Sequence, residues 1–159
     1  MKKGLWRDVL GRWLALAFRL YLGGVFVYAS VYKIGYAAEF AETVASYQIV
    51  PALAVNSVAL VLPWLELICG ALLMAGVRVR TVSAMIGGLL VVFCVAVLVN
   101  LLRETPIDCG CFHTIDEAMT WMTLVRDLTW LGMAIHIFWF DSPLALERRY
   151  EAPLKEMIP

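Results

Sequence analysis

The stretch VSAMIGGLLVVFCVAVLVNLL, residues 82–102, contains no charged side chain and determines the class of fold. A run of about 18 or more mostly apolar residues is long enough to cross the hydrocarbon core of a bilayer as a helix. The core of a soluble domain does not need an uninterrupted apolar run of this length. We therefore predict a membrane-spanning helix here.

Three further stretches extend this pattern along the chain, at residues 13–34, 52–76 and 118–140. The last is interrupted by Arg126 and Asp127, so it can span only if that pair lies inside a bundle. The first is too long for a cleaved signal peptide. The sequence thus predicts an all-α fold, an integral membrane four-helix bundle over residues 1–141, followed by a polar cytoplasmic tail over residues 142–159.

Composition supports a membrane protein and argues against a nucleic-acid partner. Of the 159 residues, 62% are hydrophobic and 16% are charged, and the mean hydropathy is +0.81. A soluble domain is about half apolar and about a quarter charged. The net charge is zero and the chain has no basic block away from its ends. Membrane lipid is therefore the first expected partner.

The distribution of Lys and Arg predicts the orientation, because these residues mark the cytoplasmic side of short loops. The segments 35–51 and 103–117 contain one of them, Arg103. The opposite segments contain nine: Lys2, Lys3, Arg7, Arg12, Arg78, Arg80, Arg148, Arg149 and Lys155. Both termini are thus expected in the cytoplasm of a bacterium, with the chain in the inner membrane. Segment 35–51 has helical spacing of apolar residues and is expected to form an amphipathic helix on the outer, periplasmic face.

The segment PIDCGCFHTID, residues 106–116, holds Cys109 and Cys111 on the predicted periplasmic side. Cysteines outside the cytosol are oxidised or under redox control. A bridge across the single residue Gly110 removes little chain entropy and has difficulty reaching relaxed disulfide geometry. Strained bridges are readily reduced and tend to be catalytic or regulatory. We therefore predict that these two cysteines take part in thiol–disulfide exchange, with His113 as a supporting residue.

Two other interpretations of this segment stay open. The bridge could only tie down a loop, or the three residues Cys109, Cys111 and His113 could capture Zn or Cu(I). The spacing is not that of a closed four-ligand zinc site, so no metal is expected. Cys69 and Cys94 lie within the predicted spans at different depths and are poor partners for the pair.

The chain resembles the MauE branch of the DoxX-like membrane proteins. The resemblance runs from about residue 19 to about residue 135 and is carried by RLYLGGVFVYASVYKI, SYQIVP, LPWLELICGALLMAGVRVR, IDCGCFH and LVRDLTWLGMA. It implies a four-helix membrane protein linked to methylamine utilisation, with Cys109 and Cys111 in the redox position and periplasmic thioredoxin-like proteins as partners. The family often has glycine after Cys-Gly-Cys-Phe, where this chain has His113.

Ionisable residues within the predicted spans are expected to be paired or functional, because burying them in a bilayer is costly. From their depths we predict two ion pairs, Arg19–Glu66 and Lys33–Asp127. Alternatively, Lys33 or Arg126 stabilises a thiolate or an anionic quinone head group, which makes a quinone the one candidate cofactor.

Smaller features of the spans are interpreted as structural. His136 is expected to be a hydrogen-bonded residue inside the bundle rather than a haem ligand. Four glycines are expected to allow close approach of helices: Gly23, Gly24, Gly87 and Gly88.

Two functions remain in competition. In the first, the protein is a membrane thiol–disulfide component, possessing oxidoreductase activity or serving such an enzyme. In the second, it is a non-catalytic small subunit of a larger respiratory or quinone-linked complex. The absence of a second cysteine pair in the spans favours the subunit, and the strained Cys-Gly-Cys pair favours thiol exchange.

Overall fold

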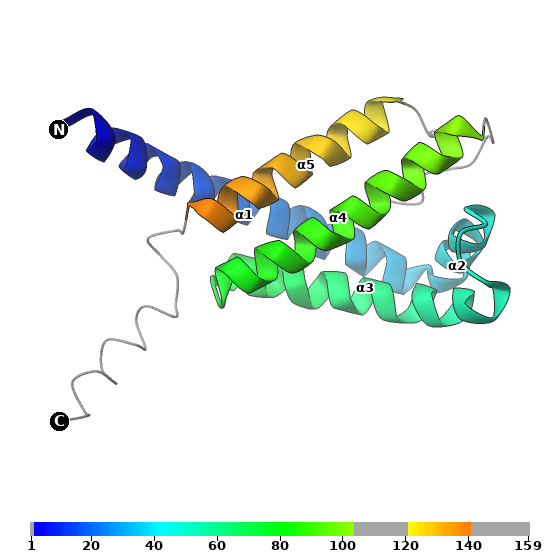
Figure 1. Ribbon diagram of the computed structural model, residues 1–159. Coiled ribbons are helices and arrows are strands. Elements are labelled where there is room, and N and C mark those ends of the chain that lie inside the picture. Colours follow the sequence, from blue (N-terminus) through cyan, green and yellow to red (C-terminus); the bar gives the residue numbers. More distant parts are fainter. Residues whose placement is uncertain (1, 104–120, 141–159) are drawn as a thin grey trace, which may run out of the picture.

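The computed structural model describes residues 2–103 and 121–140, and within these ranges all the regular structure is helical (Figure 1). The helices are α1 (Lys2–Gly35), α2 (Ala37–Ser46), α3 (Ala52–Ala75), α4 (Val79–Leu102) and α5 (Trp121–Trp139). The predicted all-α class is confirmed.

Three of the helices are long and apolar enough to cross a membrane: Leu10–Gly35 within α1, all of α3 and all of α4. They correspond to the first three predicted spans. Helix α5 has 19 residues but is not among these three, because Arg126, Asp127 and His136 lower its hydropathy. That α5 also crosses the membrane, completing a four-span bundle, stays a prediction.

The turn between α3 and α4 is short because a left-handed residue ends α3. Gly76 has φ 76°, which a residue without Cβ adopts at little cost. Its N–H donates to the carbonyls of Leu72 and Leu73, and Val77 N–H also donates to Leu72. These bonds satisfy carbonyls left open at the end of a helix. The chain can therefore reverse at once into α4.

The four long helices are arranged as two neighbouring pairs. Helix α1 packs along α3 and α4 along α5, while contacts of α1 with α5 and of α3 with α4 join the pairs. Successive long helices run in opposite directions (Figure 1). As a result α1 ends, α3 begins, α4 ends and α5 begins at the same end of the molecule as α2. We call this the α2 end, and the two residues that flank segment 104–120, Arg103 and Trp121, lie there.

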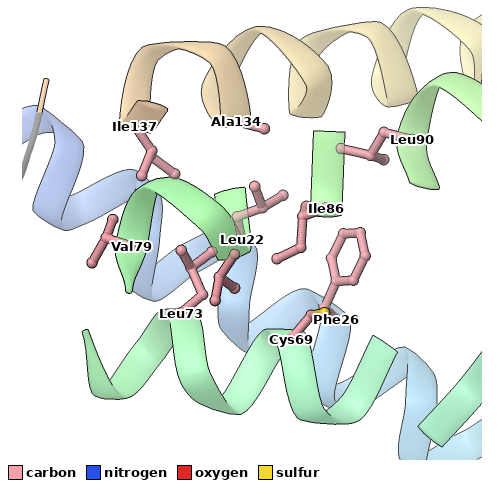
Figure 2. Close-up of a cluster of buried hydrophobic side chains, with 10 residues drawn as sticks. Leu22, Phe26, Cys69, Leu73, Val79, Ile86, Leu90, Ala134 and Ile137 are labelled. Atoms are coloured by element: carbon pink, nitrogen blue, oxygen red, sulfur yellow. The ribbon is translucent and has the colours of Figure 1, made fainter. Parts of the chain in front are cut away.

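The core draws on all four long helices, as Figure 2 shows for the largest cluster of buried side chains. A second, smaller cluster joins Phe40 and Val44 of α2 to Val55 and Ala59 of α3. The helix predicted within segment 35–51 is thus confirmed, and its apolar side packs onto α3. That α2 lies along a membrane surface stays a prediction.

The outer faces of the long helices are apolar, unlike the surface of a soluble protein. Large apolar residues are exposed along the outer faces of the helices, among them Leu20, Leu60 and Val92. Among the residues whose burial the structure describes, seven polar or charged ones are buried beside the apolar core: Arg19, Ser30, Lys33, Glu66, Ser83, Asn100 and Asp127. Exposed apolar faces suit lipid contact, which confirms the prediction of membrane lipid as a partner.

Close approach of helices occurs at Gly23, as predicted, and its partner is Gly70, which the sequence analysis did not single out. A Cβ built on Gly70 lies 2.9 Å from the carbonyl oxygen of Gly23 and 3.1 Å from Phe26 Cβ. The same prediction is wrong for Gly24 and Gly88, where an added Cβ meets no atom within 4 Å. At Gly87 the nearest atom is 3.9 Å away, which is ordinary contact.

Candidate functional site

A cluster of ionisable side chains lies between the four long helices, and we take it as the candidate site. It consists of Lys33 on α1, Glu66 on α3 and Asp127 on α5. Their residues are 3%, 2% and 3% exposed. Ionisable groups buried in a membrane protein are costly to place and commonly mark function.

Lys33 and Glu66 form a salt bridge that uses both carboxylate oxygens. The Nζ atom of Lys33 donates to Oε1 at 2.9 Å and to Oε2 at 2.8 Å. The two side chains are each 3% exposed. A buried ion pair is retained only when good geometry offsets the loss of solvation, and this two-oxygen contact provides it.

Two aromatic rings surround the same ammonium group. Lys33 Nζ lies 5.1 Å from the ring centroid of Phe40 and 5.0 Å from that of Phe93. A cation within about 6 Å of a ring is attracted by the electron-rich face of that ring, more strongly when water is excluded. Phe40 is on α2 and Phe93 on α4. Lys33 therefore makes contacts with α2, α3 and α4 at once.

Asp127 supplies the third charged group of the cluster, from α5. Its Oδ1 atom accepts from Nε of Arg126 at 3.3 Å. The carboxylate is 4% exposed and the Arg126 side chain 31% exposed, so the arginine reaches outward from a buried partner. Its guanidinium carbon lies 4.9 Å from the Trp130 ring centroid. The neutral sum of Lys33, Glu66, Arg126 and Asp127 lowers the cost of holding four charges between helices.

A cavity of about 30 Å³ lies beside these ion pairs. Lys33, Glu66 and Asp127 supply its polar lining, and the rest is apolar and drawn from α1, α4 and α5: Val25, Phe26, Ala29, Leu90, Phe93 and Trp130. A water molecule needs about 10–15 Å³ of such volume. The cavity therefore has room for about two waters.

The predicted partners of the ion pairs are wrong, since Glu66 pairs with Lys33 rather than with Arg19, and Asp127 pairs with Arg126. The reason is the register of α1 against α3, which is set where Gly23 meets Gly70. From the 1.5 Å rise per residue, Lys33 is about 9 Å further toward the α2 end than Glu66, and Arg19 is about 12 Å further from that end than Glu66.

Side-chain direction then decides between the two partners. Helical side chains lean toward the N-terminus of their own helix. Because α1 and α3 are antiparallel, Lys33 leans away from the α2 end and Glu66 leans toward it. The two side chains therefore lean toward each other, which closes the gap between them. Arg19 leans away from Glu66. Side-chain direction was the signal in the sequence that could have identified the correct pair.

Cys109, Cys111 and His113 lie outside the described residues, so the predicted thiol pair and the weaker metal alternative stay predictions. The segment that contains them joins Arg103 to Trp121, both at the α2 end. Cys69 and Cys94 are buried free cysteines. In residues 2–103 and 121–140, no group of three or more His, Cys, Asp or Glu residues could hold a metal ion.

His136 joins α5 to α1, in agreement with the structural role predicted for it. Its Nε2 atom lies 3.3 Å from the carbonyl oxygen of Gly11, to which it donates. The imidazole also stacks on Phe140 with ring centroids 4.6 Å apart and meets the Phe18 ring edge-on at 5.4 Å. These contacts lie toward the end of the molecule opposite α2.

Comparison with known proteins gives one family and several relatives. The family model for the methylamine utilisation protein MauE matches residues 11–140. The chain is 33% identical to the methylamine utilization protein MauE of Paracoccus denitrificans over 123 residues, which are 76% of this chain and 66% of that protein. The corresponding protein of Paracoccus versutus is 34% identical over 121 residues, 75% of this chain and 65% of that protein.

A more distant relative gives the same result. The MauE protein of Methylorubrum extorquens is 32% identical over 112 residues, 69% of this chain and 59% of that protein. The matched regions thus span about two thirds of the length of these curated relatives or slightly less. No solved structure matches the chain significantly.

Proposed function

Because the chain belongs to the MauE family of methylamine utilisation proteins, we propose that it is an accessory membrane protein of that system. In this role it exchanges thiol and disulfide equivalents with a periplasmic thioredoxin-like protein through Cys109 and Cys111. The observation that carries the proposal is the pair itself. Cys109 and Cys111 are separated only by Gly110, in the segment that connects the α2 ends of α4 and α5.

The exchange balances without an added cofactor. The thiolate of one cysteine attacks the disulfide of the partner, forming a mixed disulfide and releasing one partner thiolate. The second cysteine then attacks the mixed disulfide, so this protein is left oxidised and the partner is left as a dithiol. The two protons of the original thiols end on the partner. Run in reverse, the same steps oxidise the partner, and either direction is compatible with the pair.

Orientation supports the choice of partner. Lys2, Lys3, Arg7 and Arg12 are near the start of α1, and Arg78 and Arg80 are at the start of α4, all at the end opposite α2. Basic loops stay in the cytoplasm. This distribution supports a periplasmic location for the α2 end and the thiol pair, in an inner-membrane protein. The membrane domain then comprises residues 1–141, α5 included, and residues 142–159 form a cytoplasmic tail.

Trapping of the mixed disulfide tests the proposal. Cys109→Ser and Cys111→Ser are expressed separately in the native host, and membranes are run on a non-reducing gel. One of the two variants should give a higher band that a reductant removes and in which mass spectrometry identifies a thioredoxin-like protein. The double variant is the control and should give none. Absence of an adduct from both single variants, with full function of the double variant, would contradict thiol exchange.

A second candidate function rests on the other cysteines. Cys69 and Cys94 are buried and unbridged, so the described helices contain no second redox pair that could relay electrons. A non-catalytic subunit of a larger respiratory or quinone-linked membrane complex needs no such relay. For that function, the complex should assemble and work after both Cys109 and Cys111 are replaced. Native gels of the double variant separate the two candidates.

A further inference from the structure

The cavity beside Lys33 meets the physical requirements of a bound-water site, although it lies among membrane-spanning helices. Water occupies a buried cavity only if the site is polar, has enough volume and offers two to four hydrogen-bonding partners. Here the volume is about 30 Å³ and three ionisable side chains line it. A cavity with only apolar lining would stay dry.

The arrangement of charges around the cavity allows such water to bridge two charged groups. Both oxygens of Glu66 accept from Lys33, while Oδ1 of Asp127 accepts from Nε of Arg126 at 3.3 Å. Asp127 lines the cavity together with Lys33 and Glu66. Water between them can donate to one carboxylate while accepting from the ammonium group, which connects α5 to the Lys33–Glu66 pair.

We propose that this cavity is a hydration site, in which about two water molecules bridge the Lys33–Glu66 pair and Asp127. Through this bridge the ammonium group of Lys33 interacts with a carboxylate from each helix pair, Glu66 of α1–α3 and Asp127 of α4–α5. The inference does not depend on the proposed thiol exchange, because it uses none of residues 104–120.

Radiolytic footprinting detects water at such a place. A short X-ray pulse produces hydroxyl radicals from water, and these oxidise aromatic side chains next to that water. The test uses the whole protein in lipid nanodiscs. Phe26, which lines the cavity and is 6% exposed, should be oxidised. Phe18, which packs against the apolar core and does not line the cavity, should not. Equal labelling of Phe26 and Phe18 would overturn the proposal.

A cavity-filling substitution with a matched control sharpens the result. Ala29 lines the cavity and Ala17 lies on an exposed face of the same helix. Ala29→Leu should reduce oxidation of Phe26 several-fold, whereas Ala17→Leu should leave it unchanged. If Ala29→Leu does not fold, the smaller Ala29→Val is used with Ala17→Val, and a lesser reduction is expected. A Phe26 signal that persists in a folded Ala29 variant shows that the water is elsewhere and rejects the site.

Discussion

At the scale of single residues, the Lys33–Glu66 pair predicts a difference between two substitutions of one carboxylate. Removing one partner of a buried ion pair leaves an uncompensated charge and costs about 3–5 kcal/mol, less where another group takes over the lost partner. Glu66→Ala removes both oxygens to which the ammonium group donates directly, whereas Glu66→Gln keeps one carbonyl oxygen. Glu66→Ala should therefore lower the melting temperature in detergent more than Glu66→Gln.

The control for this experiment is Glu42→Ala, because Glu42 is an exposed carboxylate on α2. It should melt with the parent protein. If Glu66→Ala also melts with the parent, the two-oxygen contact with Lys33 contributes nothing to stability.

The two cysteines outside the described helices predict the opposite result for stability. A disulfide stabilises chiefly by restricting the unfolded chain, and the effect decreases with the length of the closed loop. With one residue between Cys109 and Cys111, replacing both by Ser should change the melting temperature very little. A large decrease, measured for the oxidised protein, would show that the pair acts as a structural staple. It would favour the loop-tying interpretation over thiol exchange.

At the scale of helices, the crossing of α1 and α3 predicts opposite effects for two glycine substitutions. Gly70→Ala introduces a methyl group 2.9 Å from the backbone oxygen of Gly23, which a rigid backbone can accommodate only by moving the helices apart. Gly24→Ala meets nothing within 4 Å and gains helix propensity of up to about 1 kcal/mol.

Thermal unfolding of the two variants in the same detergent shows whether each substitution raises or lowers the melting temperature. Gly70→Ala should melt below the parent protein, and Gly24→Ala should melt at or above it. Equal melting of both variants would mean that the close crossing at Gly23 does not hold α1 against α3. It would also undermine the register that brings Lys33 to Glu66.

The helices themselves were predictable, because the hydropathy and the length of an apolar run depend only on consecutive residues. The predicted start of α3 at residue 52 agrees with the structure, and the predicted end of α4 at residue 102 does too. Pairing between helices was not predictable in the same way. Depth alone suggested Arg19 for Glu66, but the partner depends on where Gly70 meets Gly23 and on the direction in which each side chain leans. The crossing point is a property of two helices together, whereas the direction of lean follows from each helix and could have been applied to the predicted spans.

The aromatic partners of Lys33 could not be predicted from the sequence either. Phe40 and Phe93 are 53 positions apart in the sequence, and either could have packed in an apolar core. Only the fold brings them to one ammonium group. The position of Cys109 and Cys111 between two helices, by contrast, followed directly from the spans that flank them.

At the scale of the whole molecule, the arrangement of charges predicts where each end of the chain lies. If α1, α3, α4 and α5 all cross the membrane, the two termini are on one side, and Lys and Arg identify it as the cytoplasm. Tags on either terminus should be protected from protease added to intact spheroplasts. After mild reduction, Cys109 and Cys111 should react with a membrane-impermeant maleimide, while the variant lacking both should not react, since Cys69 and Cys94 are buried.

The same experiment tests the crossing by α5, which is the long helix without a candidate membrane span in the part of the chain that the structure describes. If α5 does not cross, the chain has three spans and its termini lie on opposite sides. Protease would then remove a C-terminal tag from intact spheroplasts but leave an N-terminal tag in place. Removal of both tags would instead reverse the whole orientation, which would put the thiol pair in the cytoplasm and leave it without a periplasmic partner. Protection of both tags, together with labelling of the cysteine pair, is the expected result, because Asp127 is buried and lines the same cavity as Lys33 of α1 and Glu66 of α3 rather than facing lipid.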